Sequence, residues 1–233
     1  MIIKSLAVGP IQANCYILGC PETKEALIID PGGDPERIEG QLDRYSLKPV
    51  IYLHTHGHLD HVGGTAGLHQ SLGGEILIHQ ADQFLYDNAK QQGIDFGLEI
   101  PESEPVDRFI TDGEIISWGN LQGKVIHTPG HSPGGICFRI SGKLITEGNA
   151  PESPTPTGQE ETADWVFTGD TLFNGSIGRT DLPGGSYSTL MQSIKDHLLS
   201  MPDETVIAPG HGPLSTIGQE KRSNPFVLEL LQP

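Results

Sequence analysis

The sequence has few cysteines and no long hydrophobic run. Its three cysteines, Cys15, Cys20 and Cys137, are too few for a disulfide framework, and we expect reduced thiols. No run of 18 apolar residues occurs, so no segment is predicted to span a membrane. The apolar run at residues 6–8 is too short for the core of a signal peptide. These absences predict a cytoplasmic protein without membrane partners.

Basic residues are also scarce. Lys and Arg number 14 against 30 Asp and Glu, which gives a net charge of −16 with neutral histidines. Such a surface repels the phosphates of nucleic acids and of anionic membranes, so nucleic acid is not an expected partner. The sequence also lacks a G-x-S-x-G nucleophile elbow, a P-loop and a dinucleotide-binding fingerprint. Serine hydrolases of that type and the common nucleotide-binding enzymes are therefore excluded.

Glycine and proline, in contrast, are abundant. With 30 Gly and 18 Pro, about a fifth of the chain favours tight turns, which argues against a helical bundle. Apolar runs predict strands at 2–8, 14–18, 25–30, 49–53, 75–78, 106–110, 114–118, 123–127, 135–140, 143–145, 165–169 and 204–208. One helix is predicted to begin at Pro35, with Asp34 as its N-cap. Further helices are predicted at 63–72, 80–91 and 187–199, and at 216–231 with a break at Pro225. These elements divide into two halves, each with strands first and a strand–helix alternation near its end. This pattern favours two sheets packed face to face with helices outside.

One stretch, residues 146–163, differs from its surroundings. It has three prolines and four glutamates and almost nothing apolar. Such a segment cannot bury enough surface to offset the entropy lost on ordering. We expect a mobile insertion in a single domain that spans residues 1–233.

The histidines are clustered. Residues 54–61 read HTHGHLDH and follow a predicted strand. Side chains at i and i+2 of an extended segment project to the same side, so His56 and His58 can share one metal ion. Asp60 and His61 follow and are positioned for a second ion. Histidine and aspartate are ligands that zinc and iron use, whereas the alternative is a cluster of solvated loop histidines.

Three later loops add candidate ligands. His131 lies in TPGHSPGG, Asp170 in TGDT and His211 in PGHGP, each next to a predicted strand. Seven ligands are too many for one ion and suit two ions that share a bridging carboxylate, for which Asp170 is the natural candidate. Asp30, at another strand end, either bonds a metal ligand or forms an Asx turn. The remaining histidines are expected to be structural or exposed: His54, His69, His79, His127 and His197.

These motifs, in this order and after LIIDPGG, resemble the metallo-β-lactamase superfamily along essentially the whole chain. The resemblance implies an α+β fold, a four-layer αββα sandwich of two mixed β-sheets with helices outside, and a site at the sandwich edge. It implies that His56, His58 and His131 bind one metal ion. Asp60, His61 and His211 would bind a second, with Asp170 between the two. The expected cofactors are two divalent ions, zinc first, with iron or manganese as alternatives.

Within that superfamily, GDTLFNGSIGRTDLPGG and PGHGPLSTIGQEKRSNPF are similar to short bacterial glyoxalase II-type hydrolases. The resemblance implies hydrolysis of a thioester such as S-lactoylglutathione by a metal-bridging hydroxide. Asp60 is expected to orient this nucleophile and to accept the proton of the water from which it forms. Arg179 is the expected substrate-binding residue, because longer two-domain enzymes have a glutathione-contacting lysine there. Asp181 replaces their tyrosine and could instead pair with Arg179. Their terminal basic residues have no counterpart here, so glutathione recognition is less well supported than metal chemistry.

Three other functions remain alternatives. Persulfide dioxygenases share the HxHxDH and GRTD segments and use one iron, but their last histidine loop does not usually read PGHGP. A nuclease of this fold would need a basic patch, for which 14 basic residues are too few. A non-catalytic binding module would not need seven ligands. The sequence leaves the oligomeric state open.

Overall fold

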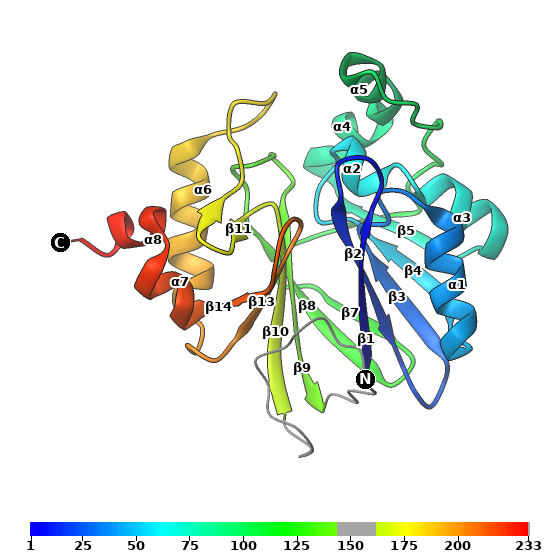
Figure 1. The fold of residues 1–233 in the computed structure, drawn as a ribbon, viewed down its shortest axis with the longest axis horizontal. Helices are drawn as coiled ribbons and strands as arrows, with labels where there is room; N and C mark the ends of the chain where they lie inside the picture. Colours follow the sequence, from blue (N-terminus) through cyan, green and yellow to red (C-terminus); the bar gives the residue numbers. More distant parts are fainter. Residues whose placement is uncertain (144–161, 233) are drawn as a thin grey trace.

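Two six-stranded sheets pack face to face and carry helices on their outer faces (Figure 1). The computed structural model describes residues 1–143 and 162–232. The layers are those of the predicted αββα sandwich, so the expected fold class is confirmed. Within the described residues, no helix is long and apolar enough to cross a membrane.

The first sheet is mixed, in the order β1-β2-β3-β4-β5-β6. Its first three strands are antiparallel, and β3 to β6 run parallel. The strands are β1 (Ile2–Val8), β2 (Ala13–Gly19), β3 (Glu25–Ile29), β4 (Lys48–Leu53), β5 (Glu75–His79) and β6 (Arg108–Ile110). The helices of this half are α1 (Pro35–Tyr45), α2 (Leu59–Val62), α3 (Thr65–Leu72), the 3₁₀ turn η1 (Gln80–Asp82), α4 (Gln83–Asp87) and α5 (Ala89–Phe96).

The second sheet is also mixed, in the order β14-β13-β10-β9-β8-β7, and only β10 and β13 are parallel neighbours. Its strands are β7 (Ile115–Trp118), β8 (Leu121–His127), β9 (Ile136–Lys143), β10 (Thr162–Gly169), β13 (Val206–Pro209) and β14 (Ser215–Thr216). A small ribbon pairs β11 (Leu172–Phe173) with β12 (Ser176–Ile177). The helices are α6 (Tyr187–Ser193), the π turn η2 (Ile194–Leu198), α7 (Ile217–Ser223) and α8 (Pro225–Leu230).

Strand β3 shows why the sandwich forms. Its run of apolar residues is buried on both faces, as is typical of a strand covered by a sheet and by helices. Leu27 and Ile29 belong to the core between the sheets, whereas Ile28 packs in the outer layer with Ile38 and Leu42 of α1. Each such side chain contributes about 1.5–3 kcal/mol when fully buried. The sandwich is therefore held by a central core and two outer cores.

The start of α1 differs in detail from the prediction. Pro35 occupies the first position as expected, but Asp34 adopts a left-handed conformation (φ 50°) and its side chain makes no cap hydrogen bond. Its carboxylate accepts instead from Gly9 N at 3.1 Å and from Arg37 Nη1 at 2.7 Å. The carboxylate thus ties the β1–β2 turn to α1.

Other differences concern boundaries. The helix expected at 80–91 is broken at Asn88 and continues to Phe96, beyond its expected end. The strand expected at 135–140 extends to Lys143 as β9, whereas residues 144 and 145 of the strand expected at 143–145 lie outside the described residues. The short elements α2, β11, β12 and β14 were not predicted. The helices expected near 63–72 and 187–199 and the break at Pro225 are confirmed, the second with a π turn.

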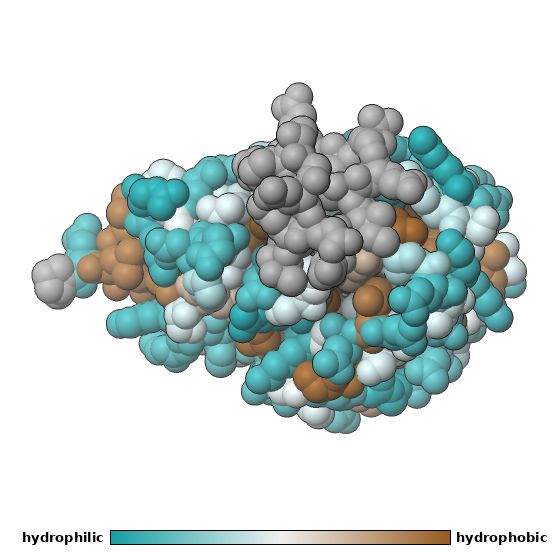
Figure 2. All heavy atoms as spheres, turned by 90° about the horizontal axis from the view of Figure 1, so that it is seen from below, coloured by the Kyte–Doolittle hydropathy of each residue, from teal (hydrophilic) through white to brown (hydrophobic). Residues whose placement is uncertain are grey.

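Strands β9 and β10 form an antiparallel pair that joins His131 to Asp170 in the sequence. The pair ends, away from those residues, at Lys143 and Thr162. The insertion expected at 146–163 therefore lies outside the described residues, except that 162 and 163 belong to β10. The coloured part of the face seen from below is mostly hydrophilic, with separate hydrophobic spots (Figure 2).

Candidate metal centre

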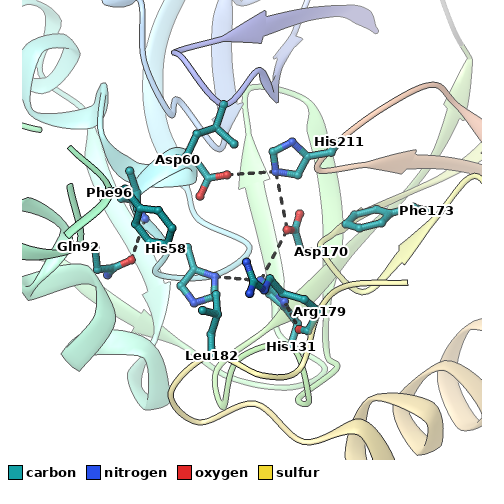
Figure 3. Close-up of a pocket in the computed structure, with 12 residues that line it drawn as sticks. His58, Asp60, Gln92, Phe96, His131, Asp170, Phe173, Arg179, Leu182 and His211 are labelled. Atoms are coloured by element: carbon teal, nitrogen blue, oxygen red, sulfur yellow. Dashed lines mark hydrogen bonds and ion pairs between the residues drawn. The ribbon is translucent and has the colours of Figure 1, made fainter. Parts of the chain in front are cut away.

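The seven predicted ligands lie together at one edge of the sandwich. They follow the ends of four strands from both sheets, since His56 and His58 come after β4, His131 after β8, Asp170 after β10 and His211 after β13. Asp60 and His61 lie on α2, a single helical turn that follows His58. Figure 3 shows His58, Asp60, His131, Asp170 and His211 around one pocket.

Three imidazoles form a first group. His131 Nε2 lies 2.9 Å from His58 Nδ1 and 3.2 Å from His56 Nε2. All three side chains are buried and come within 4.8 Å of one another. His56 and His58 thus share one group, as expected from their i, i+2 spacing.

Asp60, His61 and His211 form a second group. His211 Nε2 lies 3.1 Å from Asp60 Oδ2 and 3.3 Å from His61 Nε2. His61 Nε2 is 3.7 Å from Asp60 Oδ2. Two ring nitrogens and one carboxylate oxygen therefore face a common point.

Asp170 lies between the two groups. Its Oδ2 is 3.6 Å from His131 Nε2 in the first group and 3.7 Å from His211 Nε2 in the second (Figure 3). Its Oδ1 lies 3.4 Å from His61 Nε2. This is the placement that a bridging carboxylate requires.

Hydrogen bonds on the far side of the rings fix their orientation. Asp30 Oδ2 accepts from His61 Nδ1 at 2.9 Å and from Thr55 Oγ1 at 2.6 Å, while its Oδ1 accepts from Thr55 N at 2.7 Å. Because the Thr55 hydroxyl donates to Asp30, its oxygen accepts from His56 Nδ1 at 3.1 Å. The network leaves Nε2 of His56 unprotonated and directed at the site, as in metal sites with oriented histidines. Of the two roles expected for Asp30, the bond to a ligand is confirmed.

The charges around the rings suit bound cations. Burial, with neighbouring imidazoles, lowers the pKa of His56 far below its usual value and that of His58 to about 3, so both rings are neutral ligands at pH 7. Burial alone would also lower the pKa of His61, but Asp60, Asp170 and Asp30 outweigh it and raise that pKa to about 10. Burial alone would raise the pKa of Asp60, but the nearby His61 and His211 outweigh burial and bring that pKa below its usual range. The carboxylates at this edge thus favour positive charge between them.

Three atoms test whether this donor set fits metal ions. Asp170 Oδ1 is buried and accepts no hydrogen bond from any residue of the described ranges. His56 Nε2 and His131 Nε2 face each other at 3.2 Å although both rings donate through Nδ1, to Thr55 Oγ1 and to the carbonyl oxygen of Arg179. A buried oxygen without a donor and two opposed lone pairs are both satisfied by cations. The residues present therefore fit two divalent ions.

A cavity of about 370 Å³ opens over this cluster. Besides the ligands it is lined by Ile11, Leu59, Gln92, Phe96, Phe173, Arg179 and Leu182. Arg179 reaches the cavity as predicted, but its guanidinium donates two bonds of 2.7 Å to Asp181. Both side chains are exposed, so solvent screens this ion pair.

The histidines expected to be structural or exposed lie outside the two groups. His54 is fully buried with Nε2 3.3 Å from Thr65 Oγ1. His127 stacks on His79 with 4.1 Å between ring centroids, and its Nε2 donates to the carbonyl of Pro133 at 2.9 Å. Neither ring belongs to a group of possible ligands among the described residues, in agreement with the expectation that they bind no metal there.

Sequence reasoning missed two residues that hold the ligand loops. Asp82 contacts the loops of His58 and His131, and Gln92 of α5 bonds both Gly57 O and Leu59 N, at 3.3 and 3.2 Å. Neither residue lies in a recognisable motif. The only signal in the sequence was the position of Asp82, which lies between strand β5 of the first sheet and helix α4.

The order of the motifs, the two sheets and the shared edge site agree with one protein family. The sequence profile of the metallo-beta-lactamase superfamily matches residues 8–143 and 159–211. The chain belongs to the metallo-beta-lactamase superfamily. The resemblance expected from the motifs is thereby confirmed for fold and family.

Relatives within this superfamily cover almost the whole chain. The chain is 40% identical to hydroxyacylglutathione hydrolase GloC of Haemophilus influenzae over 229 residues, 97% of this chain and 98% of that protein. It is similar to the crystal structure of the BLEG-1 B3 metallo-beta-lactamase, with a TM-score of 0.81, 36% identity and coverage of 97% and 99%. It is also similar to TTHA1623 in a di-iron-bound form, with a TM-score of 0.78, 38% identity and coverage of 96% and 99%.

Proposed function

We propose that this member of the superfamily is a metal-dependent hydrolase that cleaves thioesters of the S-lactoylglutathione type. The observation that carries the proposal is the convergence of two ligand groups, with Asp170 between them, on the floor of one cavity. The name of the Haemophilus relative supports the choice of a thioester.

The ligand groups define the chemistry available. His56, His58 and His131 would hold one ion, Asp60, His61 and His211 the other, and Asp170 would contact both. Divalent ions bound there would lower the pKa of a water toward about 7 and polarise a substrate carbonyl. Zinc is the first candidate, and iron is the metal in the related di-iron structure.

Asp60 is the residue we assign to the reacting water. It lines the cavity, and its Oδ2 is held 3.1 Å from His211 Nε2. Its pKa lies below the usual range, so it is an ionised acceptor at neutral pH. Asp60 would orient the water by accepting a hydrogen bond from it and, because the pKa of Asp60 is low, would take its proton once bound ions have lowered the pKa of the water. A thiolate leaves without a dedicated acid, so the products would be a hydroxy acid and a free thiol.

The walls of the cavity suggest how a substrate lies. Ile11, Phe96, Phe173 and Leu182 offer apolar surface beside the ligands, and Phe96, Phe173 and Leu182 point toward the pocket in Figure 3. Arg179 is the basic residue among the cavity-lining side chains of the described chain. We assign it to an anionic group of the substrate, for which it would leave Asp181. Because Arg179 would have to give up its ion pair with Asp181, we expect weak recognition of the glutathione carboxylates.

The decisive experiment combines metal analysis with substrate assays. The purified protein is analysed for metal per chain and assayed with S-lactoylglutathione, with a persulfide in an oxygen electrode and with a β-lactam. Two ions per chain and turnover of the thioester above the other substrates are the expected result. One iron per chain with oxygen uptake would instead favour a persulfide dioxygenase, the alternative that shares the HxHxDH motif. Preferential β-lactam turnover would also contradict the proposal.

A further inference from the structure

A carboxylate outside the metal ligands joins their two main loops. Asp82 ends η1 and has no solvent-exposed surface. It is not among the cavity-lining residues, so it does not reach the reacting groups. Its position between the loops of His58 and His131 raises the question of what a buried carboxylate does there.

Within the described residues, the donors that hydrogen-bond the Asp82 carboxylate all belong to these two loops. Oδ2 accepts from Gly57 N, which lies between His56 and His58, at 3.0 Å. The same oxygen accepts from Ser132 Oγ at 2.6 Å, and Oδ1 accepts from Gly134 N at 2.5 Å. Ser132 directly follows His131 in the sequence. One side chain thus fixes the distance between a loop of the first half and a loop of the second.

The two glycines that donate to Asp82 permit this close approach. A Cβ atom on Gly57 would lie 2.8 Å from the carbonyl oxygen of Asp82, and one on Gly134 would lie 2.8 Å from its Cγ. Real Cβ contacts of that length essentially never occur. Both loops therefore use glycine where they meet Asp82, and any larger residue would push a loop away.

The three histidines of the first group come from these same loops. His56 and His58 flank Gly57, and His131 precedes Ser132. The second group depends on Asp82 much less, because Asp60 and His61 lie on α2 and His211 follows β13. His61 has its own carboxylate partner in Asp30.

We propose that Asp82 is a positioning residue for the first metal ion, which sets the separation of His131 from His56 and His58. The carboxylate can do this because it accepts from donors on both loops while being shielded from water. Partners behind the ligands commonly change metal affinity by about 10–100-fold when they are removed. The proposal concerns metal binding alone and does not depend on which substrate the site takes.

The test is zinc binding by the full-length Asp82→Asn variant. An amide of the same size would place its N–H groups against Gly57 N–H or Gly134 N–H, so at least one of these two backbone N–H groups would lose its acceptor. We expect zinc affinity for one of the two ions to fall by about tenfold or more in chelator competition, while the second ion is retained. Zinc alone is the probe, so the result does not depend on turnover of any substrate.

Asp107→Asn is the matched control. Asp107 is more exposed than Asp82, but it is also a carboxylate that accepts from a backbone amide of the first half, Ile76 N at 2.8 Å, and this bond involves no ligand loop. This variant should bind both ions as the wild type does. If Asp82→Asn fails to fold, Ser132→Ala removes only the 2.6 Å bond and should weaken one ion in the same direction. Wild-type zinc affinity in the folded Asp82→Asn or Ser132→Ala variant, or equal loss of both ions, would overturn the proposal.

Discussion

His131 Nδ1 donates a 2.7 Å hydrogen bond to the backbone carbonyl oxygen of Arg179. The bond fixes the imidazole so that Nε2 faces the other ligands. Since the acceptor belongs to the backbone, the side chain at position 179 can change without releasing the ring. Arg179 thus contributes to the site twice, through its carbonyl to a metal ligand and through its guanidinium to the cavity rim.

This separation makes Arg179→Ala a clean test of substrate binding. We expect KM for S-lactoylglutathione to rise severalfold, because the cation is lost, with both metal ions retained because the carbonyl remains. Steady-state kinetics and metal analysis measure the two effects independently. An unchanged KM would mean that Arg179 serves only its ion pair with Asp181.

Asp170→Ala should be the most damaging single change among the ligands. It removes the oxygen atoms that face both groups and leaves the two ions without the carboxylate between them. We expect loss of metal and a fall in kcat of several orders of magnitude. His211→Ala, in contrast, should deplete mainly one ion. Metal analysis of both variants provides the comparison, and an Asp170→Ala protein with two ions and full activity would disprove the bridge.

His54 should make the metal-free protein sensitive to acid. Burial lowers the pKa of its ring to about 4 from 6.5, so the neutral ring stabilises the fold fully above pH 6.5. That contribution is lost as the pH falls toward 4, because unfolding then takes up a proton. Relative to His54→Phe, the wild type should lose up to about 3 kcal/mol of unfolding free energy between pH 6.5 and 4. Urea unfolding of both chelator-treated proteins measures it, and a constant difference would show that His54 does not titrate.

Shortening the segment between β9 and β10 should leave the site intact. The eight residues of β9, at about 3.3 Å each, separate its far end from the ligand loops by roughly 26 Å. Replacing residues 147–160 by a short glycine-containing turn should therefore change neither kcat nor metal content, and loop closure becomes only slightly easier. Kinetics and metal analysis test this. A tenfold lower kcat/KM in a folded variant would show that the segment acts at the site.

The sequence was most informative where ligands are close neighbours in the chain. HTHGHLDH contains four of the seven predicted ligands, and its i, i+2 pair indicates a shared ion without any tertiary information. The three others could be recognised because each follows a strand on a Gly/Pro loop. Alternating apolar runs also placed most strands, since burial on a sheet leaves a local pattern.

What could not be predicted depends on contacts between distant residues. Asp82 bonds groups that are 25, 50 and 52 positions away, so no local pattern marks it. Ser141 and Gly142 lie in the gap between the strands expected at 135–140 and 143–145, but pairing with β10 keeps β9 continuous to Lys143. Helix α2 has four residues and is too short to show helical periodicity. In each case tertiary structure outweighed local preference.

Each ligand group takes side chains from both halves of the sandwich, and this has a consequence for metal exchange. An ion held there loses its ligands from one half when the two halves separate locally at that edge. The rate of metal release should therefore follow the local opening of the sandwich rather than the strength of any single metal–ligand bond. A conservative core change further along the strands from the ligands, such as Ile140→Val opposite Trp165, would then act as a metal-release mutation. The protein would lose its ions, and with them its activity, at temperatures at which its secondary structure is still intact.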